Sequence, residues 1–150
     1  MEKKDVSRER MRLLLTMVIS PMLRRLGEHV FLLDSCCSPS AMVLNTSRLC
    51  KDFYESNKQR STGTLGGEYH APLIGNFKFF DMCDYDPDLP MSILSWYRLL
   101  QLGCSIEQHN DTHIIHFPSI PVTLHASWID GVLAGDLTPL SNSSSSTLIL

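Results

Sequence analysis

Several signatures of common enzymes are missing from these 150 residues. There is no Gly-x-x-x-x-Gly-Lys-Ser/Thr phosphate loop, no Gly-x-Gly-x-x-Gly dinucleotide fingerprint and no Gly-x-Ser-x-Gly nucleophile turn. No pair of cysteines has the short spacing of a structural zinc site. These absences exclude the enzymes that such motifs identify and favour a binding protein over a catalyst.

Charge and long apolar runs are also scarce. Charged residues make up 19% of the chain and the formal net charge is -3, so no broad basic surface points to nucleic acid. No apolar run approaches the roughly 20 residues of a membrane-spanning helix. The apolar segment 13–19 follows Glu2, Asp5 and Glu9, and no small-x-small cleavage site comes after it, which argues against a secretory signal. We therefore expect an intracellular protein, in the cytoplasm or nucleus, without a membrane span.

The cysteines do not form a convincing disulfide framework. There are five of them, an odd number, and Cys36 and Cys37 are adjacent, so reduced thiols are the simpler interpretation. Three Asn-x-Ser/Thr sequons begin at Asn45, Asn110 and Asn142, and they would matter only on a secreted chain. Whether they are ever glycosylated stays open.

An amphipathic pattern near the N-terminus is the strongest interface candidate. Its apolar residues recur at the i, i+3, i+4, i+7 spacing of one helix face, and methionine-rich faces adapt well to partners. The candidate interface residues, with two basic residues at the rim, are Met11, Leu14, Leu15, Val18, Met22, Arg24 and Arg25. Such a face packs either on the domain's own sheet or on another chain.

The remaining pattern predicts an α+β domain over residues 1–140. N-terminal helices would pack on an antiparallel sheet of about four or five strands, with one helix inserted at 89–102 and a disordered Ser-rich tail at 141–150. A helix is also expected to begin at Pro39 and to carry Met42, Val43, Leu49 and Phe53. Segment 29–33 is compatible with either helix or strand.

Five segments have the pattern of strands. Residues 68–73 and 76–82 would form a hairpin around Ile74-Gly75, and 104–109 and 112–117 a second one around Asn110-Asp111. In 122–128 apolar and polar residues alternate, which predicts that Val122, Leu124, Ala126 and Trp128 face the core.

Two clusters could bind metal, and both have the wrong spacing. Cys104, His109, His113 and His116 lie close in sequence, but in a strand His113 and His116 would point to opposite faces. Asp84, Asp86 and Asp88 begin like a calcium loop, but the glycine and glutamate that should follow are absent. We therefore expect no cofactor, and we interpret the acidic run as a solvated loop in which Asp88 caps the next helix.

The leading hypothesis is a non-enzymatic protein-interaction module, a subunit or adaptor of an intracellular complex that binds another protein chain or itself. The alternative is a small enzyme or a zinc-binding regulator that uses the His-rich segment 104–125. A viral accessory protein would also be compatible with so small a chain without signatures. The residues do not identify the partner, the pathway or the oligomeric state.

Overall fold

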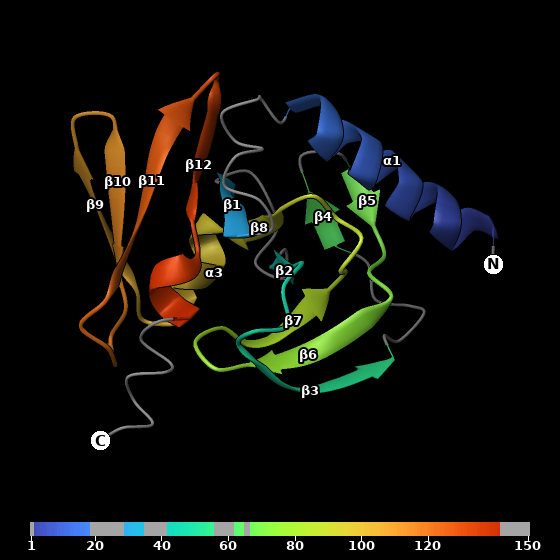
Figure 1. The fold of residues 1–150 in the computed structure, drawn as a ribbon, viewed down its shortest axis with the longest axis horizontal. Helices are drawn as coiled ribbons and strands as arrows, with labels where there is room; N and C mark the ends of the chain where they lie inside the picture. The colour runs from blue at the N-terminus through green and yellow to red at the C-terminus, as the bar shows by residue number, and fades with distance from the viewer. Residues whose placement is uncertain (1, 19–28, 35–41, 56–61, 65–66, 142–150) are drawn as a thin grey trace.

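A mixed β-sheet of ten strands dominates the described part of the chain (Figure 1). The structure, a computed structural model, describes residues 2–18, 29–34, 42–55, 62–64 and 67–141. The strand order is β3-β6-β7-β2-β8-β1-β12-β11-β10-β9, and β4 and β5 form a separate two-stranded sheet. The expectation of helices on an antiparallel sheet of four or five strands is therefore wrong.

The elements follow one another in a simple order. They are α1 (Glu2–Val18), β1 (Val30–Asp34), β2 (Val43–Leu44), β3 (Cys50–Glu55), β4 (Thr62–Thr64), β5 (Gly67–Tyr69), β6 (Leu73–Phe77), β7 (Asp81–Tyr85), β8 (Ser92–Ser95), α3 (Trp96–Gln101), β9 (Ser105–His109), β10 (Thr112–His116), β11 (Thr123–Ile129) and β12 (Val132–Asp136).

Strand β1 lies in the middle of the large sheet. It runs parallel to β8, with Leu32 opposite Ile93, and antiparallel to β12, with Phe31 opposite Gly135. All five of its residues are buried. A strand that is covered on both faces reads as a continuous apolar run, which is why the sequence alone leaves 29–33 open between helix and strand.

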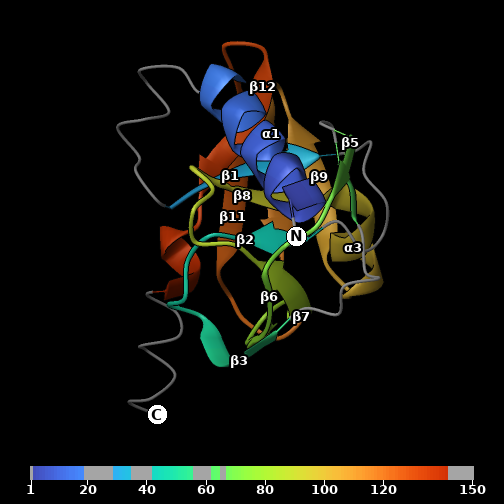
Figure 2. The same ribbon diagram turned by 90° about the vertical axis from the view of Figure 1, so that its right-hand side faces the viewer.

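Two apolar clusters pack against the two faces of this sheet. On one face, Met11 and Leu15 of α1 pack with Val30, Leu32 and Tyr69. Figure 2 shows α1 lying across the sheet on this side. On the other face, the neighbouring residues of β1, Phe31 and Leu33, pack with Leu99 of α3 and with inward-facing residues of β10, β11 and β12. The alternation of β1 therefore divides its residues between the two cores.

The helix expected from Pro39 through Phe53 is not present in its described part, which forms β2 and β3 instead. The polar residues between the two strands explain the difference. Asn45 is buried: its side-chain amide donates to the carbonyl of Leu89, and its oxygen accepts from the hydroxyl of Ser92. These bonds fix the extended backbone through contacts distant in sequence, and a helical spacing of apolar residues does not reveal them.

The helix expected over 89–102 is shorter than predicted, because its first part is the buried strand β8. Helix α3 begins at Trp96, where the side chain of Ser95 accepts a hydrogen bond from the backbone amide of Arg98. Asp88 does not cap this helix. The expected helix end is confirmed, since Gly103 has a φ of 91°. None of the helices in the described part of the chain has the length and apolar character required to cross a bilayer.

One of the two expected hairpins is confirmed. Strands β9 and β10 pair as predicted, with Asn110 in the left-handed region at a φ of 55°. The other hairpin is wrong, because Ile74 and Gly75 lie inside β6, and the chain turns only after Phe77. An Ile-Gly pair is compatible with a turn, but it is also compatible with a strand in which a neighbouring side chain leaves no room for a Cβ atom. The second case applies here, because a Cβ added at Gly75 would lie within 3 Å of the side chains of Cys50 and Phe77.

Candidate functional site

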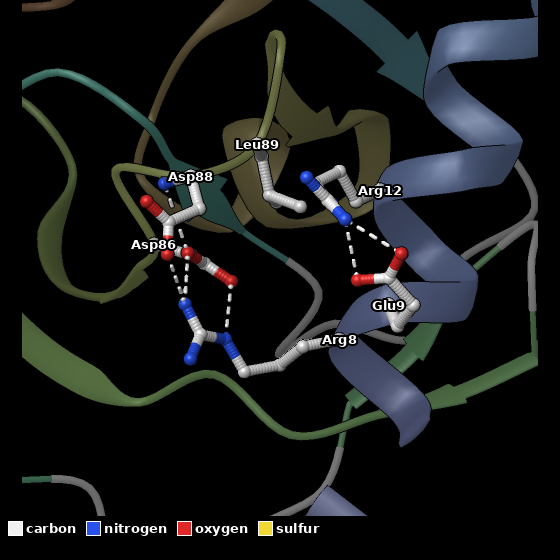
Figure 3. Close-up of a pocket in the computed structure, with 6 residues that line it drawn as sticks. All are labelled: Arg8, Glu9, Arg12, Asp86, Asp88 and Leu89. Carbon is white, nitrogen blue, oxygen red and sulfur yellow. Dashed lines mark hydrogen bonds and ion pairs between the residues drawn. The ribbon is translucent and has the colours of Figure 1, made fainter. Parts of the chain in front are cut away.

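A polar pocket lies between α1 and the loop that joins β7 to β8 (Figure 3). It has a volume of about 320 Å³, and its lining residues are Arg8, Glu9, Arg12, Asp86, Asp88 and Leu89. Its charged groups are bonded to one another. Arg8 contacts Asp86 and Asp88, and Arg12 contacts Glu9 at 2.6 Å. The pocket therefore presents charges that are already paired, which makes it a poor site for a charged ligand.

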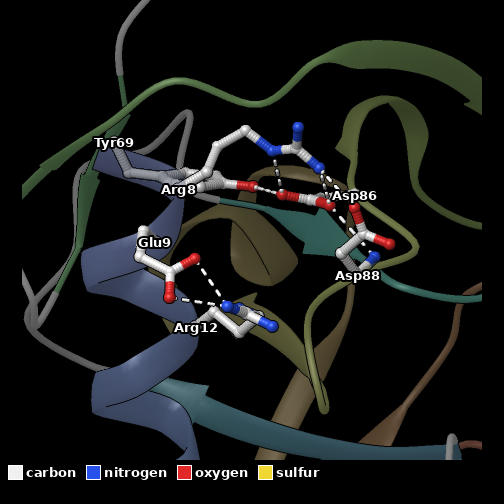
Figure 4. Close-up of polar contacts among 6 residues, drawn as sticks. All are labelled: Arg8, Glu9, Arg12, Tyr69, Asp86 and Asp88. Carbon is white, nitrogen blue, oxygen red and sulfur yellow. Dashed lines mark hydrogen bonds and ion pairs between the residues drawn. The ribbon is translucent and has the colours of Figure 1, made fainter. Parts of the chain in front are cut away.

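Asp86 is the centre of this network (Figure 4). It is 1% exposed, accepts a hydrogen bond of 2.6 Å from the Tyr69 hydroxyl, and is bonded by the Arg8 guanidinium at 2.9 and 3.1 Å. The bond to Asp86 raises the pKa of Arg8, and burial beside the Asp86 carboxylate raises the pKa of Tyr69. The network holds α1 against the sheet. The prediction of a solvated acidic loop is therefore wrong for Asp84 and Asp86, which are buried, whereas Asp88 is exposed.

A second pocket, which we call the tryptophan pocket, is lined mainly by apolar and aromatic side chains. It has a volume of about 220 Å³, and it lies where β1, the start of α3, β10 and the β11–β12 hairpin meet. These elements are neighbours in Figure 1. The lining residues are Leu32, Leu33, Asp34, Trp96, His113, Trp128, Gly131, Val132 and Leu133. Both tryptophans of the chain are among them.

Trp128 is the most exposed aromatic side chain of this pocket. It is 57% exposed, so the expectation that it faces the core is wrong. Leu124 and Ala126, which precede it on the same side of β11, are fully buried as predicted. The difference arises because Trp128 lies near the end of the β11–β12 hairpin, beyond the residues that cover Leu124 and Ala126. The predicted alternation of β11 is therefore confirmed for Leu124 and Ala126, but Trp128, which lies on the same side of the strand, is exposed.

Among the described residues that line the tryptophan pocket, His113 and Asp34 are the titratable groups. His113 is 6% exposed, and its ring packs edge-on against Trp96 with ring centres 5.3 Å apart. Its Nδ1 atom has no hydrogen-bond partner among the residues that the structure describes. Asp34 ends β1 and is 8% exposed. Buried polar groups that line an accessible pocket are typical of binding and catalytic sites.

Sequence reasoning misses most of this pocket. Asp34 and Trp96 are not singled out by any motif, and Trp128 is assigned to the core. The sequence does contain one signal for Asp34, because this charged residue directly follows the apolar run 30–33. An aspartate next to a buried strand is a candidate functional residue, since aspartate is rarely buried without a specific reason. The other lining residues come together only because β1 lies between β8 and β12 in the sheet.

The expected zinc candidates do not converge. Cys104 and His113 are buried, His109 is exposed and His116 is half-buried. His109 and His116 lie 3.3 and 2.9 Å from the Glu107 carboxylate. Hydrogen bonds with His116 and then His109 lower the pKa of Glu107. Among the described residues, no group of three or more His, Cys, Asp or Glu side chains could hold a metal ion.

The expected interface on the N-terminal helix is only partly within the described residues. Met11 and Leu15 are buried against the chain's own sheet, so they offer no surface to a second chain, and Leu14 is half-buried. The side chain of Val18 and the residues Met22, Arg24 and Arg25 lie outside the described part. The role of these four residues in binding stays a prediction.

The cysteines should differ sharply in reactivity in the folded protein. Cys50 is half-buried, whereas Cys83 and Cys104 are buried, and burial raises the pKa of the Cys104 thiol to about 11. Because the thiolate is the reactive form, iodoacetamide at pH 8 should modify Cys50 well before Cys104. Mass spectrometry of peptides from timed samples measures this order. All three should react equally fast in denaturant, and equal rates in the native protein would contradict the burial of Cys104.

No protein-family model matches this chain, and no curated protein or solved structure shows significant similarity to it. Its function must therefore be inferred from the described residues themselves.

Proposed function

We propose that this chain is a non-enzymatic interaction module that binds a segment of another protein at the tryptophan pocket. The observation that carries this proposal is Trp128, a large aromatic side chain that is 57% exposed at the rim of a pocket. Tryptophan is enriched among the residues that dominate binding energy at protein interfaces. The proposal keeps the function expected from the sequence but places the binding surface on the β-sheet side of the molecule.

The size of the pocket supports a protein partner. Pockets for small molecules and cofactors usually measure roughly 300–1,000 Å³. The tryptophan pocket, at about 220 Å³, suits a single inserted side chain. A side chain anchored in a pocket and surrounded by weaker contacts is a common arrangement at protein interfaces.

Replacing Trp128 by alanine should abolish partner binding and leave the fold intact. An exposed side chain contributes little to folding, so the free energy of unfolding should change by less than about 1 kcal/mol. Partner affinity should fall by at least about 2 kcal/mol, the usual threshold for a dominant interface residue. Affinity purification with mass spectrometry identifies proteins that the wild type retains and Trp128→Ala loses, and calorimetry with the purified partner then measures the loss.

The matched control is Tyr97→Ala. Tyr97 lies on α3, is 55% exposed and does not line the pocket. It should leave partner binding unchanged. A folded Trp128→Ala protein that retains every partner of the wild type would refute the proposed function. Light scattering over a range of concentrations tests whether the partner is a second copy of the chain.

A second candidate function is a small enzyme that uses Asp34 and His113 in acid–base chemistry. The observation that favours it is that both side chains are more than nine-tenths buried and line the same pocket. Titratable groups in such surroundings are candidates for general acid–base catalysis. Turnover that is lost in both Asp34→Asn and His113→Gln, but retained in Trp128→Ala, would favour the enzyme over the interaction module.

The intracellular location expected from the sequence stays a prediction. It is supported by Cys50, Cys83 and Cys104, which are free thiols in the described part of the chain. Cys36 and Cys37 lie outside that part. The sequon at Asn45 is buried and its amide is bonded to Leu89, so the folded protein does not present it for glycosylation. Asn110 is exposed in a hairpin turn, and Asn142 lies outside the described residues.

A further inference from the structure

The strand β3 lies at one end of the ten-stranded sheet, and Figure 1 shows it along the lower edge of the molecule. In the described part of the chain it pairs with β6 on one side and with no strand on the other. The outer side of an edge strand carries a row of backbone N–H and C=O groups that can pair with a further strand. The strand β3 therefore offers a template for one more strand.

Solvent reaches both faces of β3. Successive side chains of a strand point to opposite faces, yet every residue from Lys51 to Glu55 is exposed. Phe53 and Tyr54, which follow one another, are 42% and 41% exposed, although the Phe53 ring packs on that of Tyr85 with ring centres 4.4 Å apart. Aromatic residues are enriched at protein interfaces, so exposed aromatic side chains on an edge strand favour contact with a second chain.

The order of charges along β3 makes the strand complementary to a second copy of itself. Lys51 lies two residues before Phe53, and Glu55 lies two residues after it. In an antiparallel pair centred on Phe53, Lys51 of each copy is opposite Glu55 of the other, and opposite charges across a strand pair stabilise it. A pair centred on Asp52 would instead place two like charges opposite each other. One centred on Tyr54 would place Phe53 opposite Glu55.

We infer that β3 is a self-association edge, at which two copies of the chain pair antiparallel about a two-fold axis at Phe53. Two-fold dimers bring the same surface of both copies together, as this pairing requires. A register shift lies between Cys50 and Asp52, at the start of β3, and residues 52–55 pair regularly with β6. Lys51 lies at this shift, and its long flexible side chain can still reach the opposite carboxylate.

This contact goes beyond the proposed function, because it uses none of the residues that line the tryptophan pocket. That pocket is built on β1, α3, β10 and the β11–β12 hairpin, whereas β3 is the strand at one end of the sheet. A dimer of this kind therefore presents two tryptophan pockets, and two linked sites bind a multivalent partner more tightly than one.

Sedimentation equilibrium of the full chain tests this inference. With rising concentration, up to about 1 mM, the mass of the wild type should increase from one chain of 17.0 kDa towards two, since an interface of one strand pair is weak. Lys51→Glu and Glu55→Lys should each weaken association at least about tenfold, because each places like charges opposite each other at two symmetry-related positions. The double variant, Lys51→Glu with Glu55→Lys, should recover the wild-type affinity within about threefold.

The two single variants change the net charge in opposite directions, so a loss in both does not come from total charge. Trp128→Ala should associate like the wild type, and its capture of partners is measured separately, so that the two proposals can fail independently.

Four results would each overturn the self-association edge. They are a wild type that remains monomeric, folded single variants that associate as tightly as the wild type, a double variant that stays as weak as the single ones, and a loss of self-association in Trp128→Ala. Urea denaturation checks that each variant is folded. Should a single variant fail to fold, the wild type and the double variant decide.

Discussion

Replacing Gly135 by alanine should prevent the protein from folding stably. Gly135 lies in β12, between Phe31 of β1 and Ala126 of β11. An added Cβ would overlap the backbone carbonyl oxygen of His125 and come within 2.8 Å of the Phe31 ring. The oxygen cannot move away unless β11 separates from β12. We therefore expect a loss of more than about 3 kcal/mol, the upper end of the usual cost of overpacking.

Gly131→Ala is the matched control, and urea denaturation compares the two variants. Gly131 lies in the β11–β12 turn with a φ of 86°, and nothing lies within 4 Å of a Cβ added there. Its substitution should cost only about 1–2 kcal/mol, because an L-residue is strained at positive φ. If Gly135→Ala proves as stable as Gly131→Ala, the position of β12 between β1 and β11 is incorrect.

Arg8→Met should destabilise the protein by about 3 kcal/mol, near the lower end for a broken buried ion pair. The Asp86 carboxylate, 1% exposed, would keep its bond from Tyr69 but lose the guanidinium bonded to both of its oxygens. The lower end is appropriate because the Arg8 side chain is 28% exposed. Methionine retains helix propensity and much of the apolar stem, so the substitution removes mainly the charge and its hydrogen bonds.

The matched control is Arg12→Met, one turn further along α1. Arg12 and Glu9 are about half exposed, and surface pairs of this kind contribute at most about 1 kcal/mol. A double-mutant cycle of Arg8→Met with Asp86→Asn, measured by urea denaturation, should give a coupling energy well above that of Arg12→Met with Glu9→Gln. Similar small effects at both arginines would mean that the network around Asp86 does not hold α1 on the sheet.

Local patterns predict those elements whose structure depends on nearby residues. The β9–β10 hairpin follows from its Asn-Asp turn, and the end of α3 follows from Gly103. The burial of Leu124 and Ala126 follows from alternation in β11. In each case the decisive interactions lie within a few residues along the chain, and an alternating pattern or a turn residue records them directly.

A local pattern does not predict the structure where both a helix and a strand are compatible with it. Met42, Val43 and Leu49 have a spacing that a helix can accept, yet they are buried in and around strands that pair with partners far along the chain. Ile93 is compatible with the first turn of a helix, but it lies in β8 between β1 and β2. Pairing partners distant in sequence decide these cases, and propensity gives way to them.

The sequence by itself determined the periodic segments, the turn residues and the small negative net charge. The tertiary structure alone decided that β1 occupies the centre of a ten-stranded sheet and that Asp86 joins Arg8 to Tyr69. It also decided that Asp34, Trp96, His113 and Trp128 share one pocket. The physical reason is that strand order and side-chain contacts between distant segments depend on the packing of the whole chain, whereas turns and alternation depend on a few consecutive residues.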